Sequence, residues 1–187
     1  MMLKIVLINA MTLLRIPLSV IFCAALFSDN HRSAWCGILF AIIAITDFFD
    51  GKLARKYNAQ TKLGAVFDVV SDFFFIVTAG CSLYFQRLFP WWMLVIIILK
   101  FLEFWVTSFL SVRDEKNEKV FIFDMIGRAV AISFYLFPMM ILMFKCLLSN
   151  GQFRVVTTVI YIIITILAFI SALLRIGGWA FKFKVRI

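Results

Sequence analysis

The stretch DFFDGKLARKYNAQTKLGAVFDVVSD, residues 47–72, holds four of the ten acidic residues of this 187-residue chain. Asp47 and Asp50 are three residues apart, and Asp68 and Asp72 are four apart, so on helices each pair shares one face. Carboxylates are costly in strongly apolar sequence unless a cation lies close to them. If the two helices are neighbours, the four carboxylates converge, and the stretch predicts a divalent metal site.

The residues around these aspartates indicate which metal and which ligand would bind. Ligands that are all oxygen suit Mg²⁺, Mn²⁺ or Ca²⁺ and argue against zinc. Magnesium is commonly held by a few carboxylates together with substrate phosphates, which implies a substrate that carries phosphate. Gly51 and Ala54 leave room for a ligand beside the backbone, and Arg55 offers a planar fork of donors to a phosphate or diphosphate.

Eight positions of this stretch form the pattern D-x2-D-G-x2-A-R-x8-G-x3-D-x3-D, which resembles the signature of the CDP-alcohol phosphotransferases. The pattern is met without departure by Asp47, Asp50, Gly51, Ala54, Arg55, Gly64, Asp68 and Asp72. Members of that family are membrane enzymes that move the phosphatidyl group of a CDP-linked lipid onto an alcohol and release CMP. The resemblance therefore implies phospholipid biosynthesis from CDP-diacylglycerol and a small alcohol, by a homodimer among the lipids of a bacterial cell membrane.

The resemblance also implies roles for the residues of the motif. The four aspartates would hold two divalent ions, Mg²⁺ or Mn²⁺. Asp72 would in addition be the base that deprotonates the acceptor hydroxyl. The pocket for the nucleotide and diphosphate would be lined by four residues, Gly51, Ala54, Arg55 and Gly64.

A weaker mark lies near the start of the chain, in Asn9-Ala-Met-Thr12-Leu-Leu-Arg15-Ile-Pro17. It is similar to an opening seen in many bacterial members of the family, and it would place Asn9 and Thr12 beside the nucleotide site. These two residues are three apart and share a helix face. Capping and snorkelling at a membrane interface explain the same residues about equally well.

The composition predicts an all-α integral membrane protein. Hydrophobic residues make up 64% of the chain, and its mean hydropathy is +1.04. Apolar runs of about 20 residues predict a six transmembrane helix bundle that forms one domain over residues 1–187. The predicted spans cover residues 5–27, 34–57, 64–86, 90–111, 120–147 and 153–177.

The basic residues predict the orientation of these spans. If the amino terminus is cytoplasmic, fourteen lysines and arginines fall on that side and four on the other. By the positive-inside rule both termini are then cytoplasmic, and the aspartates lie at the cytoplasmic ends of the second and third helices. The net charge of +9 is explained by contact with anionic headgroups, so a nucleic-acid partner is not needed.

The acceptor alcohol is indicated less directly. In phosphatidylglycerophosphate synthases the fourth helix carries an Arg-Glu pair and the fifth begins with G-K-x-K-T-x-x-Q, whereas the similar places here read Lys100-Phe-Leu-Glu103 and Gly127-Arg128-Ala-Val-Ala-Ile-Ser-Phe134. The glycine and the first base are kept, but the second lysine, the threonine and the glutamine are replaced. Lys100 and Glu103, one turn apart, are expected to neutralise each other.

A phosphate-bearing acceptor still needs fixed positive charge around it. The candidates are Lys119, Arg128 and Arg175, although snorkelling to the cytoplasmic interface is an equal explanation for Lys119 and Arg175. We rank glycerol 3-phosphate first as the acceptor, inositol phosphate or inositol second, and serine third.

Two other interpretations of the aspartates remain open. They could form buried ion pairs with the nearby bases Lys52, Arg55, Lys56 and Lys62, or they could line the path of a divalent-cation transporter or channel. Ion pairs would not require glycine and alanine at fixed distances in sequence from the aspartates. An arginine beside the path of a cation would repel that cation. The single histidine, His31, and the four dispersed cysteines show no metal-binding spacing.

Overall fold

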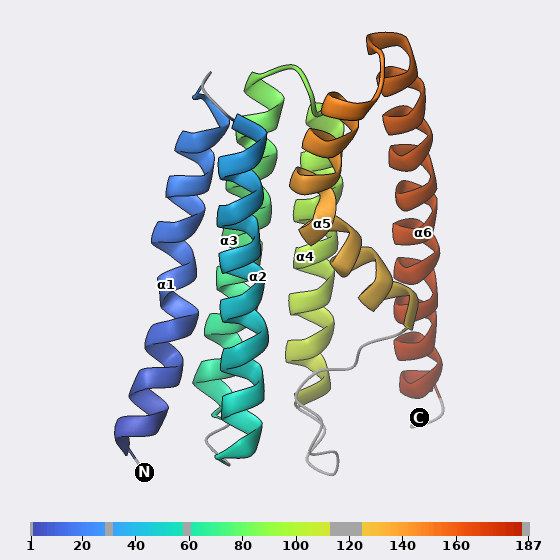
Figure 1. Cartoon of the computed structure of the whole chain (residues 1–187). Coiled ribbons are helices and arrows are strands. Elements are labelled where there is room, and N and C mark those ends of the chain that lie inside the picture. The colour runs from blue at the N-terminus through green and yellow to red at the C-terminus, as the bar shows by residue number, and fades with distance from the viewer. Residues whose placement is uncertain (1, 29–31, 58–60, 113–124, 185–187) are drawn as a thin grey trace. The chain divides into compact units, whose positions relative to one another are not determined.

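The computed structural model describes residues 2–28, 32–57, 61–112 and 125–184, and all regular structure within them is helical (Figure 1). The helices are α1 (Met2–Leu26), α2 (Arg32–Lys56), α3 (Lys62–Phe85), α4 (Trp91–Val112), α5 (Met125–Leu147) and α6 (Asn150–Lys184). The predicted all-α fold is confirmed. The last helix continues beyond the predicted end at residue 177, and the predicted start of the fifth span at residue 120 lies outside the described residues.

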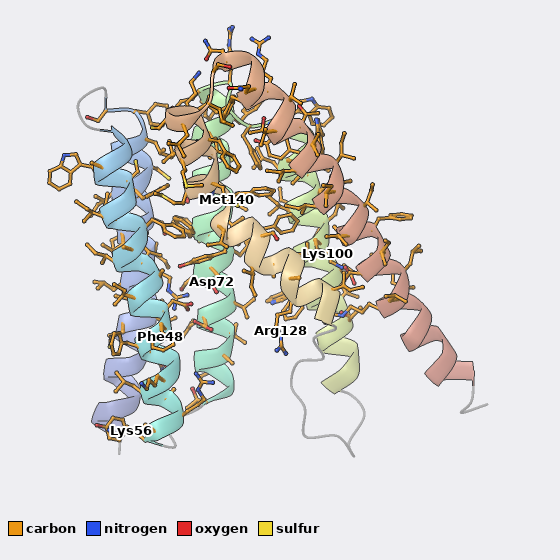
Figure 2. The ribbon with its side chains drawn as sticks, turned by 45° about the vertical axis from the view of Figure 1, so that its right-hand side comes forward. Phe48, Lys56, Asp72, Lys100, Arg128 and Met140 are labelled. Atoms are coloured by element: carbon orange, nitrogen blue, oxygen red, sulfur yellow. The ribbon has the colours of Figure 1, made fainter. Side chains whose placement is uncertain are left out.

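Five of the described helices, α1, α2, α3, α5 and α6, are long and apolar enough to cross a membrane. Passage of α4 through the membrane stays a prediction. Many large apolar side chains point away from the protein, and Phe48, Leu63 and Phe169 are each at least 60% exposed. Figure 2 shows Phe48 on the outer side of α2. Such side chains suit contact with lipid tails, so the helices indicate a multi-pass membrane protein.

The chain divides into two structural units. The first comprises Met1–Phe89 and Pro138–Leu147, and the second comprises Pro90–Phe137 and Leu148–Ile187. The division falls inside α5 at Pro138, where the proline ring removes one backbone donor from the helix. The single domain expected over residues 1–187 stays a prediction.

In the first unit, α1 packs along both α2 and α3, and Figure 1 shows the three helices side by side. Their contact is apolar toward one end, where the buried rings of Phe22 and Phe75 meet edge to face at 5.4 Å. At that end the Gln86 side chain donates to the carbonyl of Leu26 at 2.9 Å. The other half of α1 lies beside the parts of α2 and α3 that carry the aspartates.

In the second unit, α4 packs against α6. The ammonium of Lys100 lies 2.5 Å from a Glu103 carboxylate oxygen and 2.8 Å from the Ser171 hydroxyl, which confirms the predicted neutralisation within α4 and adds a partner on α6. Near the start of α6, the Gln152 side chain accepts from the backbone N–H of Ser149 at 3.2 Å, as in a capping box. Lys100 thus pairs with a carboxylate on its own helix and also links α4 to α6.

Candidate active site

The four aspartates lie where α2 ends and α3 begins. Asp47 and Asp50 are in the last turns of α2, and Asp68 and Asp72 are in the first turns of α3. One carboxylate oxygen from each of Asp47, Asp50 and Asp68 falls within 4.8 Å of the others. The structure therefore brings three of the four predicted carboxylates together, and their role as metal ligands stays a prediction.

A buried arginine from α1 sits at the centre of this cluster. One terminal nitrogen of Arg15, Nη2, lies 2.9 Å from Asp47, 2.8 Å from Asp50 and 3.0 Å from Asp68. The other terminal nitrogen, Nη1, donates to Asp72, which Figure 2 labels on α3. Arg15 has no exposed surface, and its one guanidinium is the shared partner of all four carboxylates.

Of the bases that the sequence suggested as ion-pair partners of the aspartates, those whose side chains the structure describes make other contacts. Lys52 lies over the ring of Phe48 at 5.7 Å, and the Nε of Arg55 donates to the carbonyl of Gly51 at 3.1 Å. Lys56 lies over the ring of Tyr57, 5.9 Å from its centroid, and the side chain of Lys62 lies outside the described residues. The counter-cation of the cluster is instead Arg15, from a helix that is distant in sequence.

Charge and donor type at the cluster fit a divalent cation. If all four aspartates are ionised, the single guanidinium leaves three negative charges without compensation among the described contacts. The donors are carboxylate oxygens, as Mg²⁺ and Mn²⁺ prefer. The side chains of Asp47, Asp68 and Asp72 are 37%, 46% and 32% exposed, whereas that of Asp50 is only 4% exposed. Three of the four can therefore be reached from outside the protein.

Thr12 supports the most buried of the four. Its hydroxyl donates to Asp50 at 3.0 Å, one helical turn before Arg15 on the same face of α1. Asp50 thus receives both an arginine and a hydroxyl donor, which fixes its carboxylate. Thr12 thus contacts a carboxylate of the motif, and its predicted place beside the nucleotide stays a prediction.

Two glycines of the motif have different surroundings. A Cβ on Gly64 would lie 3.0 Å from both the Asn9 Oδ1 and the Thr61 hydroxyl oxygen, so a larger residue there would push against these two side chains. Thr61 is the N-cap of α3 and accepts from the Gly64 N–H at 2.9 Å. A Cβ on Gly51 would meet nothing within 4 Å, so the fold itself does not demand glycine at that position. Ala54 is half-buried and Arg55 is exposed on the same helix.

Two of the three candidates for binding the acceptor, Arg128 and Arg175, belong to the second unit. Arg128 is exposed on α5, and Arg175 on α6 lies with its guanidinium 5.0 Å from the ring centroid of Phe104, in the second unit. Lys119 lies outside the described residues. The structure therefore describes a cation–π contact for Arg175 within the second unit, and the acceptor-binding role of the three candidates stays a prediction.

A comparison with protein families matches residues 5–183 to the family described as CDP-alcohol phosphatidyltransferase. The chain belongs to this family. The family match covers the helices that carry the aspartates, so the resemblance seen in the motif extends to nearly the whole sequence of this CDP-alcohol phosphatidyltransferase family member.

Curated relatives include several bacterial proteins of this type. The chain is 40% identical over 96 residues to a probable phosphatidylglycerophosphate synthase of Mycobacterium tuberculosis, in a match that covers 49% of the chain and 46% of the relative. It is 40% identical over 65 residues to the CDP-diacylglycerol–glycerol-3-phosphate 3-phosphatidyltransferase of Rickettsia felis, covering 34% and 36%. It is 22% identical over 156 residues to the CMP-forming cardiolipin synthase of Streptomyces coelicolor, covering 83% and 62%. The chain thus spans about half the length or less of the first two relatives that it matches.

Among residues of this family member, Arg15 is the one whose position sequence reasoning missed. The sequence placed it in the opening motif and among the cytoplasmic charges, without a contact to the aspartates. One signal was available: a charged residue inside an apolar span needs a partner within the protein. Thr12, Arg15 and Ser19 also lie on one face of α1, and all three are buried.

Proposed function

We propose that this protein transfers the phosphatidyl group of CDP-diacylglycerol to glycerol 3-phosphate and releases CMP. The observation that carries the proposal is the convergence of the complete aspartate motif at one point where α1, α2 and α3 meet. The names of the relatives from Mycobacterium tuberculosis and Rickettsia felis favour glycerol 3-phosphate as the acceptor. We also propose cytoplasmic termini and a homodimer, from the charge distribution and the family resemblance respectively.

In this proposal the residues of the site divide the tasks among them, and Asp72 has two. Asp47, Asp50, Asp68 and Asp72 hold divalent ions, and Thr12 and Arg15 orient the carboxylates. The ions, Mg²⁺ or Mn²⁺, neutralise the diphosphate and the charge that develops on it during transfer. Arg55, exposed at the end of α2, holds phosphate oxygens of the CDP-lipid.

The reaction itself is one substitution at phosphorus. Asp72 accepts the proton of the acceptor hydroxyl, and the acceptor oxygen forms a new bond to the phosphorus of the phosphatidyl group. The bond from that phosphorus to the bridging oxygen of the diphosphate breaks, and the bridging oxygen leaves with CMP. Asp72 is 32% exposed, so the acceptor can reach it, in contrast to the enclosed Asp50.

A second candidate function is the formation of cardiolipin. The relative with that name aligns over 83% of this chain, further than the two synthases described above, although at 22% identity. The acceptor would then be phosphatidylglycerol, a lipid alcohol whose phosphatidylation yields cardiolipin. The basic candidates Arg128 and Arg175 favour glycerol 3-phosphate, because its phosphate monoester carries more negative charge than the phosphodiester of phosphatidylglycerol.

The test is to incubate the purified protein with CDP-diacylglycerol, Mg²⁺ or Mn²⁺ and one alcohol at a time. The alcohols are glycerol 3-phosphate, phosphatidylglycerol, inositol phosphate, inositol and serine. We expect CMP release and a phosphatidylglycerophosphate product with glycerol 3-phosphate. CMP release with another alcohol alone would correct the acceptor, and no CMP release with any of them would contradict the proposed chemistry.

Gly51→Ala is expected to separate folding from ligand binding. A Cβ at Gly51 meets no atom within 4 Å, and alanine is favoured over glycine inside a helix by about 1 kcal/mol, so the melting temperature should not fall. If the nucleotide approaches the backbone here, the added methyl should weaken binding of CDP-diacylglycerol roughly tenfold, as overpacking of about 1–3 kcal/mol does. Titration of the nucleotide and thermal unfolding of the same preparation measure both effects. Wild-type affinity in this variant would place the nucleotide elsewhere.

Arg175→Gln is expected to raise the KM for the acceptor and to leave the KM for CDP-diacylglycerol nearly unchanged. Loss of one charged hydrogen-bonding partner corresponds to about 1.5–3 kcal/mol in kcat/KM for the acceptor. Arg154→Gln is the matched control, since Arg154 is exposed on the same helix about 30 Å away. Equal changes in both KM values would instead mark Arg175 as a packing residue held over Phe104.

A further inference from the structure

The position of Arg15 relative to the carboxylate oxygens has a chemical consequence. Its Nη2 atom lies 2.8–3.0 Å from oxygens of Asp47, Asp50 and Asp68, which are the residues grouped as potential ligands of one ion. An ion held by these three would occupy nearly the same point, because its bonds to oxygen are about 2.0–2.6 Å long. One guanidinium nitrogen and one ion cannot both fill that point.

The hydrogen-bonding capacity of Arg15 is also mismatched to its partners. Nη2 carries two N–H groups but is within 3.0 Å of three carboxylates, so it cannot direct a hydrogen at each of them. The Nε of Arg15 is buried and has no hydrogen-bond partner among the described residues. A spherical cation with twice the charge satisfies converging oxygens without such directional limits, and it frees the guanidinium for another acceptor.

We infer that Arg15 is an internal counter-cation that competes with the divalent ion for the carboxylates of the motif. In the metal-free protein the guanidinium holds Asp47, Asp50, Asp68 and Asp72 together against their mutual repulsion. Metal binding displaces it, so the affinity for free metal is kept low until a diphosphate adds its own negative charge. This inference rests on the metal-binding part of the proposed function, and it makes Arg15 a positioning residue for that site.

The inference predicts the direction in which metal affinity changes when Arg15 is replaced. A partner that only orients metal ligands, once removed, weakens metal affinity by roughly 10–100-fold. A competitor, once removed, has the opposite effect. We therefore expect Arg15→Gln to tighten binding of Mn²⁺ roughly tenfold or more without nucleotide, because a positive charge within a few ångströms of the ion is removed.

The experiment measures binding of Mn²⁺ alone to the full chain in detergent micelles, by the magnetic-resonance signal of free Mn²⁺. Arg87→Gln is the matched control, since it removes one positive charge in the same unit, about 20 Å along α3 from Asp72. The control should bind Mn²⁺ like the wild type. Thermal unfolding adds a second readout: Arg15→Gln should be less stable than the wild type without metal and should gain more from added Mn²⁺.

A second variant covers the case in which Arg15→Gln does not fold without metal. Arg15→Lys keeps the charge on a shorter side chain with a single ammonium, and we expect it to fold and to bind Mn²⁺ more tightly than the wild type, by several-fold. Unchanged or weaker Mn²⁺ affinity in the folded Arg15 variants would overturn the inference and leave the proposed function standing. No Mn²⁺ binding by the wild-type protein would overturn both.

Discussion

Asp72→Asn is expected to lower turnover by roughly 10²–10⁴-fold, the usual cost of losing a general base. Asparagine keeps the size of the side chain and one oxygen, but it cannot accept the proton of the acceptor hydroxyl. Asp72 is also the aspartate that contacts the Nη1 atom of Arg15, whereas the other three share Nη2, so its loss leaves three carboxylates grouped. CDP-diacylglycerol and Mn²⁺ should therefore still bind with affinity near that of the wild type.

Asp50→Asn is the comparison variant for this result. Asp50 is almost completely buried and accepts from both Thr12 and Arg15, so its replacement disturbs the geometry of the cluster rather than a proton transfer. We expect weaker binding of metal and nucleotide together with lower turnover. Turnover and nucleotide titration of both variants decide the assignment, and near-normal turnover of Asp72→Asn would show that the proton leaves by another route.

Removal of divalent cations is expected to abolish CMP release altogether. Arg15 compensates only one of the four carboxylate charges that it contacts, so a diphosphate would meet a site of net negative charge. Transfer of phosphoryl-type groups depends mainly on positioning and on neutralising such charge. The measurement is CMP release after treatment with excess chelator, followed by addition of Mg²⁺, Mn²⁺ or Ca²⁺.

Recovery of activity on adding metal back is the control, because it shows that the chelator has not unfolded the protein. We expect Mg²⁺ or Mn²⁺ to restore CMP release. Undiminished release in excess chelator would contradict the metal-dependent mechanism and would leave Arg15 and Arg55 as the cations that act on the diphosphate.

The helices and the pairing of the carboxylates on each helix were predictable because both depend on local sequence. Runs of about 20 apolar residues mark spans whatever their neighbours are. The spacing of Asp47 to Asp50 and of Asp68 to Asp72 places each pair on one face of its own helix. The ion pair of Lys100 with Glu103 is local in the same sense, since the two residues are three positions apart.

Contacts between distant parts of the chain were not predictable in the same way. Arg15 and Asp72 are 57 residues apart, and their contact exists because α1 packs against α3. Lys100 and Ser171 are 71 residues apart, and hydropathy carries no information on that pairing. A single sequence shows that a charge inside a span needs a partner, but the packing of helices decides which partner it meets.

The burial of Arg15 among acids from later helices also bears on how the protein enters the membrane. During synthesis α1 emerges first, and an arginine in a lone span costs about 2.5–3.5 kcal/mol to insert. The aspartates that neutralise it reach the membrane only with α2 and α3, which carry unpaired acids of their own. The three helices therefore gain from entering together, as one group of matched charges, and pairing of Arg15 with the acids makes assembly of the aspartate cluster a step in biogenesis.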